Sequence, residues 1–171
     1  MSEVRLLCLD VDGVLTDGRI HVHDDGAPTR AFHVHDGFAI RWFQKLGGAA
    51  AIITGKKSHG VAHRARELDI RHVVQGSDDK LRDLRRLAGE LGIALSDVAV
   101  VGDDLPDLPM LRNCGFPIAV VNAVDAVKRA ARLVTQARGG DGAVREAIEW
   151  LMRRDGRWSA VEAHYDAQAA S

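Results

Sequence analysis

The sequence predicts an α/β fold in which a parallel β-sheet carries helices on both of its faces. Two observations predict it. Short runs of β-branched and other apolar residues alternate along the chain with segments whose apolar residues recur every three or four positions. Apolar residues also make up 46% of the 171 residues, which is enough to bury a core. Strands that alternate with helices favour parallel pairing through right-handed crossovers.

The expected elements follow one another with a single interruption. The expected strands are 4–10, 49–54, 72–75, 98–102 and 116–120. The expected helices are 37–46, 59–68, 80–91, 107–113, 124–131 and 143–153, followed by a weaker helical stretch at 157–165. The helix at 80–91 shows the pattern best, with Leu84, Leu87 and Leu91 on one face. Residues from about 154 to 171 are expected to form a tail whose end frays.

The interruption lies at about residues 19–35 and is predicted to be a β-hairpin. Two strand-like runs, 19–23 and 31–35, flank the sequence Asp24-Asp25-Gly26-Ala27-Pro28. Asp-Gly followed by Pro is a turn signal. The segment is too long for a simple connection and is expected to protrude after the first strand. No linker or repeat is visible, so residues 1–171 are expected to form one domain.

Composition narrows the class of protein. The formal net charge is −1, whereas a general nucleic-acid binder would carry a basic excess. No apolar run approaches the roughly 20 residues that a membrane span requires, so neither nucleic acid nor membrane is an expected partner. The first expected strand starts at Val4 and leaves no room for a signal peptide. Cys8 and Cys114 are expected to be reduced apolar residues, and the expected location is the cytoplasm.

Charged and polar side chains follow four of the expected strands. Because ligands bind at the carboxyl ends of strands in such sheets, these side chains are expected to converge. They are Asp10 and Asp12 after the first strand, Thr54 and Lys56 after the second, Lys80 after the third, and Asp103, Asp104 and Asp107 after the fourth.

The residue types in this group suit phosphoryl transfer. Clustered carboxylates need a cation, and hard oxygen ligands favour Mg²⁺. A carboxylate at such a site can attack phosphorus, while a hydroxyl and an ammonium hold the phosphoryl oxygens. A second carboxylate two residues later can move the protons.

Three other interpretations of these residues are disfavoured by the details of the sequence. A calcium loop would need an acidic or amide residue and then a glycine where Val14 and Leu15 stand. A receiver domain would place its Thr and Lys after the phosphorylated aspartate strand. Here Thr54 and Lys80 precede Asp103. A non-catalytic oligomerising module would be marked by loss of the charged residues, and all are present.

The motif Asp10-Val11-Asp12-Gly13-Val14 resembles the first motif of the haloacid dehalogenase (HAD) superfamily of phosphatases, which have a Rossmann-like sheet. Thr54, Lys80 and Gly102-Asp103-Asp104 resemble its second, third and fourth motifs, in the same order. The resemblance implies Asp10 as nucleophile and Asp12 as general acid/base. It implies Thr54 and Lys80 as phosphoryl-binding residues, and Mg²⁺ held by Asp10, Asp103 and the backbone carbonyl of Asp12.

The spacing of the motifs leaves no room for a cap domain. Only 41 residues separate Asp12 from Thr54, and 25 separate Thr54 from Lys80. Within the superfamily, the chain resembles the capless phosphatases that act on 3-deoxy-D-manno-octulosonate 8-phosphate in lipopolysaccharide biosynthesis. That resemblance rests on the stretches 31–38, 52–58 and 139–146. It implies a homotetramer in which a neighbouring subunit helps to cover each site. The substrate-binding positions that it implies are His33, Val34, His35, Asp36, Gly37, Arg41, Lys56, Arg64 and Lys80.

Three positions depart from the pattern of these capless phosphatases. Lys56, His35 and Asp141 stand where arginine is common. An ammonium cannot reproduce the bidentate grip of a guanidinium on a carboxylate. A related substrate, such as a nine-carbon nonulosonate 9-phosphate, is therefore the alternative.

Overall fold

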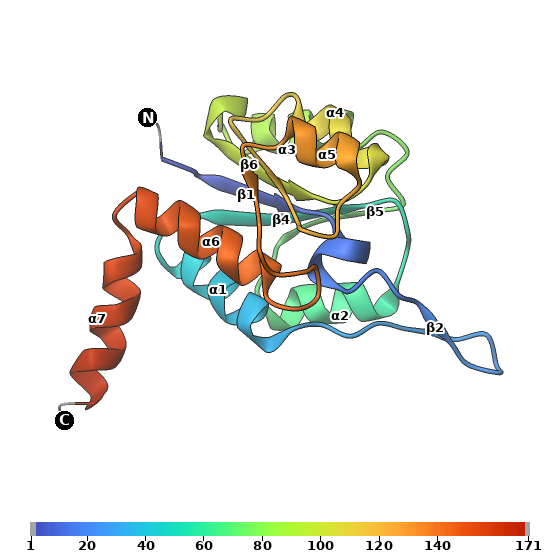
Figure 1. Cartoon of the computed structure of the whole chain (residues 1–171), viewed down its shortest axis with the longest axis horizontal. Helices are drawn as coiled ribbons and strands as arrows, with labels where there is room; N and C mark the ends of the chain where they lie inside the picture. Colours follow the sequence, from blue (N-terminus) through green and yellow to red (C-terminus); the bar gives the residue numbers. More distant parts are fainter. Residues whose placement is uncertain (1–2, 170–171) are drawn as a thin grey trace.

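The computed structural model describes residues 3–169, and its centre is a six-stranded sheet with the strand order β5-β4-β1-β6-β7-β8 (Figure 1). All five pairings in this sheet are parallel. The strands are β1 (Leu6–Leu9), β4 (Ala49–Thr54), β5 (His72–Gln75), β6 (Val98–Gly102), β7 (Phe116–Ala119) and β8 (Leu133–Val134). The predicted parallel sheet is confirmed, and β8 is a strand that the sequence did not reveal.

Helices cover both faces of the sheet, as predicted (Figure 1). One face carries α1 (Val34–Lys45), α2 (His59–Glu67) and α6 (Ala143–Arg154). The other carries α3 (Lys80–Glu90), α4 (Leu108–Leu111) and α5 (Asp125–Ala130). No helix within residues 3–169 has the length and apolar character needed to cross a membrane.

The core lies around β1, which is the reason why the site forms at its end. All four residues of β1 are fully buried between β4 and β6. Strands that are buried on both faces read as continuous apolar runs rather than alternating ones. Helix α3 buries Leu84, Leu87 and Ala88 against this core, as its spacing predicts. The rigid central strands therefore fix the positions at which their carboxyl ends deliver polar residues.

The hairpin is present, but its second strand was predicted in the wrong place. β2 (His21–Val22) pairs with β3 (Pro28–Thr29), whereas 31–35 was the expected strand. The turn is tighter than expected, because Gly26 donates to the carbonyl of His23 and His23 donates to that of Ala27. Residues from 34 onward instead begin α1, three residues before the predicted start.

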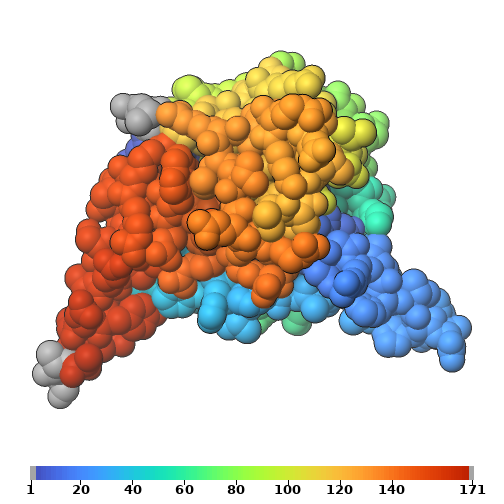
Figure 2. Space-filling view, viewed as in Figure 1, coloured from blue at the N-terminus to red at the C-terminus, as the bar shows by residue number. Residues whose placement is uncertain are grey.

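The C-terminal segment also differs from the prediction. Helix α7 spans Trp158–Ala169, so the expected fraying tail is helical through the last described residue. Trp42 of α1 stacks edge-on against His164 and Tyr165 of this helix. The hairpin and α7 project from opposite sides of the body (Figure 2).

Candidate active site at the carboxyl ends of the strands

Asp10 lies at the carboxyl end of β1 and is only 6% exposed. Its backbone N–H donates to Val101 of the neighbouring strand at 3.2 Å. The chain then makes a tight turn in which Gly13 has a φ of +100°. A Cβ at Gly13 would lie 2.0 Å from the Asp103 Oδ2 atom, so only glycine allows the turn to approach Asp103 this closely.

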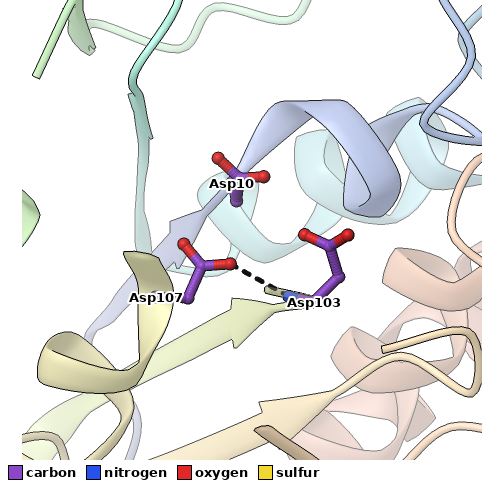
Figure 3. A group of neighbouring side chains, drawn as sticks. All are labelled: Asp10, Asp103 and Asp107. Carbon is purple, nitrogen blue, oxygen red and sulfur yellow. Dashed lines mark hydrogen bonds between the residues drawn. The ribbon is translucent and has the colours of Figure 1, made fainter. Parts of the chain in front are cut away.

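Three carboxylates meet at this point. One carboxylate oxygen from each of Asp10, Asp103 and Asp107 lies within 4.8 Å of the others (Figure 3). Asp107 is fully committed to the protein, because its Oδ2 accepts the backbone N–H groups of Asp103 at 3.0 Å and Asp104 at 3.3 Å. It braces the loop that follows β6 and thereby orients Asp103. Asp104 itself caps the short helical turn Leu105–Asp107.

Lys80 is the cation of this cluster. It begins α3, and its Nζ atom donates to Asp10 Oδ1 and to Asp107 Oδ1, both at 2.7 Å. Its side chain is only 9% exposed. The positive end of the helix dipole repels a lysine in the first turn of a helix. The two carboxylates offset this repulsion.

The charges in the cluster shift one another's proton affinities. Burial, reinforced by Asp107 and opposed by Lys80, raises the pKa of Asp10 to about 6. Burial, reinforced by Asp10 and Asp107, raises the pKa of Asp103 to about 7. For Lys80, burial acts to lower the pKa, but attraction to Asp10 and Asp107 outweighs it and the pKa is raised. Three carboxylates and one ammonium therefore leave an excess of negative charge.

This donor set fits a hard divalent cation. Asp103 Oδ1 is buried and has no hydrogen-bond partner among residues 3–169. An unpaired buried carboxylate oxygen is costly unless a cation satisfies it. Oxygen donors with an excess of negative charge are what Mg²⁺ prefers.

Asp12 belongs to a second, separate ion network. Arg30, at the base of the hairpin, forms a bidentate ion pair with Asp12: its Nε donates to Oδ1 at 2.6 Å and its Nη2 donates to Oδ2 at 3.3 Å. Lys56 Nζ lies 3.8 Å from Oδ2. Sequence reasoning identified Asp12 and Lys56 but missed Arg30, because nothing in the sequence shows that this residue folds back over 18 positions.

The remaining phosphoryl-binding candidate also lies at this edge. Thr54 ends β4 and is 3% exposed. Its hydroxyl oxygen accepts the backbone N–H of Lys56 at 3.4 Å, which holds the loop that carries Lys56.

The segment 33–37 forms the start of α1. His33 caps this helix by accepting the backbone N–H of His35 at 3.3 Å, and Val34 and His35 are exposed. Asp36 is 1% exposed and points into the protein, where Oδ1 accepts the N–H of Arg145 at the start of α6 at 2.7 Å. Burial, opposed by that hydrogen bond, raises the pKa of Asp36. Its observed contact is therefore structural.

The two predicted arginines lie in different places. Arg64 packs on Gly37, where a Cβ would come within 2.6 Å of its Nη2, and it donates to the His33 carbonyl at 3.4 Å. Arg41 pairs with Asp69 at 3.8 Å and lines a cavity of about 370 Å³ between α1 and α7. Within one chain, Arg41 thus lies with the α7 aromatics and not with the carboxylate cluster.

Three comparisons place the chain among known proteins. Residues 62–148 match the family of haloacid dehalogenase-like hydrolases. The 3-deoxy-D-manno-octulosonate 8-phosphate phosphatase of Escherichia coli K12 is 42% identical over 91% of this chain and 83% of its own. The solved structure of the Moraxella catarrhalis phosphatase of the same name, in complex with a magnesium ion, a phosphate ion and KDO, is 42% identical, with a TM-score of 0.93 over 95% of this chain and 93% of that one. The cobalt-bound phosphatase from Haemophilus influenzae is 32% identical, with a TM-score of 0.87 over 90% of both chains.

Proposed function

The chain belongs to the haloacid dehalogenase-like hydrolases, and we propose that it is the Mg²⁺-dependent phosphatase of 3-deoxy-D-manno-octulosonate 8-phosphate in lipopolysaccharide biosynthesis. The observation that carries the proposal is the convergence of Asp10, Asp12, Lys80 and Asp103 at one edge of the sheet, in two distinct ion networks. One network holds a nucleophile beside a cation site, and the other holds a proton-transfer group.

Asp10 attacks the phosphorus of the ester. Its Oδ1 is held by Lys80, which leaves Oδ2 to form the new bond to phosphorus as the bond to the sugar oxygen breaks. Asp12 gives its proton to that departing oxygen. Asp12 then takes a proton from a water molecule whose oxygen attacks the phosphoryl group on Asp10. This releases inorganic phosphate and restores the carboxylate of Asp10 and the protonated carboxyl of Asp12.

Asp10, Asp103 and the backbone carbonyl of Asp12 would hold Mg²⁺, which supplies the positive charge that allows a carboxylate to approach a phosphate dianion. Asp107 would not be a ligand, because its two oxygens are used by Lys80 and by backbone N–H groups. Lys80 and Thr54 would hold the phosphoryl oxygens as charge builds on them.

The sugar-acid part of the substrate would lie along the start of α1. His33, Val34 and His35 present this edge, and the buried Gly37 allows Arg64 to approach it. Lys56 and Arg64 would supply positive charge to the substrate. A groove of about 630 Å³ opens beside it, lined by His33, His35, Asp141 and one face of α6. Asp36, which was predicted to bind substrate, would instead support this edge from inside the protein. Arg41 would reach a substrate only in a neighbouring subunit of the assembly.

We further propose that four such chains assemble into a homotetramer in the cytoplasm, in which a neighbouring subunit covers each site. The projecting hairpin, whose Val22 is 70% exposed, offers a surface for that contact (Figure 2). Sedimentation should give a mass of four chains. A stable monomer with full activity would contradict the shared site.

The decisive assay is phosphate release in Mg²⁺ from three esters: the eight-carbon sugar-acid phosphate, a nine-carbon nonulosonate 9-phosphate and a plain aryl phosphate. Preference for the eight-carbon acid supports the proposal. Preference for the nine-carbon acid would reassign the substrate. Full turnover by Asp10→Asn would refute the phospho-aspartate route.

A further inference from the structure

We propose that Arg30 is a positioning residue for Asp12 and that it couples proton transfer to the hairpin. The inference rests on the proposed function, in which Asp12 protonates the leaving oxygen. Arg30 has no place in the motifs that the sequence displays.

The contact has the geometry of an orienting clamp. Two guanidinium nitrogens meet the two carboxylate oxygens, at 2.6 Å for Nε to Oδ1 and 3.3 Å for Nη2 to Oδ2. A planar fork of this kind fixes the plane of the carboxylate as well as its position. The Arg30 side chain is 6% exposed and that of Asp12 is 18% exposed, so water competes little for the contact.

The second cation near Asp12 cannot do the same. Lys56 lies 3.8 Å from Oδ2 and its side chain is 59% exposed, so it offers a single, weak contact from a solvent-exposed ammonium group. Lys80 is committed to Asp10 and Asp107. Arg30 is therefore the group that sets the direction of the Asp12 carboxyl.

The two hydrogen bonds from Arg30 differ in length, which indicates different roles for the two carboxylate oxygens of Asp12. Oδ1 is held by the short bond to Nε, whereas Oδ2 has the longer bond to Nη2. Opening the longer bond frees Oδ2 while Nε still anchors the side chain. Oδ2 then takes up a proton from water, and it is the atom that passes this proton to the leaving oxygen.

The proposed coupling to the hairpin rests on the position of Arg30 in the chain. It directly follows β3, and the hairpin residues on both sides of the turn are exposed. Through Arg30, the protruding hairpin contacts Asp12, the residue that moves the proton. A displacement of the hairpin would reach Asp12 through this ion pair.

The test uses a series of substituted phenyl phosphates whose leaving phenols differ in acidity. These esters carry no carboxylate, and kcat/KM reports the steps up to transfer of the phosphoryl group to Asp10. A well-placed general acid helps a poor leaving group far more than a good one. For Arg30→Gln we expect kcat/KM for phenyl phosphate to fall about 10- to 100-fold, and that for 4-nitrophenyl phosphate to fall less than about 3-fold.

Arg19→Gln is the matched control. It removes the same charge from the same hairpin, but its side chain is 81% exposed and pairs with Asp17. We expect it to match the wild type across the series. Arg30→Lys, which keeps the charge without the fork, should lie between the wild type and Arg30→Gln, and it carries the test should Arg30→Gln fail to fold by circular dichroism.

An equal loss across all leaving groups would overturn the positioning role, as would an Arg30→Gln variant that matches Arg19→Gln. These results differ from failure of the proposed function itself. In that case the wild-type protein with Mg²⁺ would release no phosphate from any ester, and the Arg30 proposal would fall with it.

Discussion

Asp103→Asn should stabilise the metal-free protein, although it removes a proposed metal ligand. Asp103 lies within 4.8 Å of two other carboxylate oxygens. Each such pair repels by about 3.5 kcal/mol at an effective dielectric constant of about 20. Lys80 offsets part of this. The pKa of Asp103, raised from 3.8 to about 7 by burial and then by Asp10 and Asp107, expresses the same cost.

The cost has a defined pH dependence. An acid whose pKa is raised in the folded state destabilises the fold above its unfolded pKa, and the penalty is complete above its folded pKa. Because Asp103 is partly exposed, solvent screening reduces the penalty to about 2 kcal/mol at pH 7.5. Asp103→Asn should recover it, which is about 4–8 °C in Tm for a domain of this size. Near pH 4 the gain should vanish, since Asp103 is then protonated in the folded wild type.

The assay is thermal and urea unfolding in EDTA and in Mg²⁺, at pH 4 and pH 7.5. Mg²⁺ should raise the Tm of the wild type and leave that of the variant nearly unchanged. Asp166→Asn, which removes an exposed carboxylate from α7, should show neither effect. A variant that is less stable than the wild type in EDTA at pH 7.5 would refute the reasoning.

Three further outcomes are expected. Lys80→Met leaves two buried carboxylates without their cation, so urea unfolding should show a loss of about 3 kcal/mol, and phosphate release should cease. Gly13→Ala forces a Cβ into Asp103 at a φ of +100°, so calorimetric titration should show Mg²⁺ affinity reduced by about tenfold or more. Asp36→Ala removes the acceptor for Arg145 at the start of α6 and should cost about 1 kcal/mol, whereas Asp36→Asn should keep most of that bond.

The regular part of the fold could be predicted because its signals are local. The expected ranges 49–54, 72–75 and 98–102 agree with the observed strands, since buried parallel strands read as short apolar runs. The second strand of the hairpin was harder to predict from the sequence. His33 and His35 alternate with Phe32 and Val34 as a strand would, but capping by His33 starts α1 there instead. Only two residues form β8, too few to give a pattern.

The site residues that could be predicted are again those whose sequence signals are local. Asp10, Lys80 and Asp103 each follow a strand or begin a helix, so the sheet alone brings them together. Arg30 reaches Asp12 through an irregular segment, and no pattern reports such a return. Arg41 has helical spacing like its neighbours, but the structure places it beside Asp69.

The charges in the site show why the cation and the substrate depend on each other. When the four carboxylates of the site (Asp10, Asp12, Asp103, Asp107) are all ionised, they outnumber by one the three cations in contact with them (Lys80, Arg30, Lys56), so the site carries a net charge of −1. That net charge opposes a phosphate dianion. A bound divalent cation changes this net charge to +1, which attracts the dianion. The same ion that satisfies Asp103 Oδ1 therefore reverses the sign of the site, and inorganic phosphate should inhibit or bind only when Mg²⁺ is present. Equal phosphate affinity in EDTA and in Mg²⁺, measured by calorimetry, would mean that the cationic side chains of the protein hold the anion without the metal.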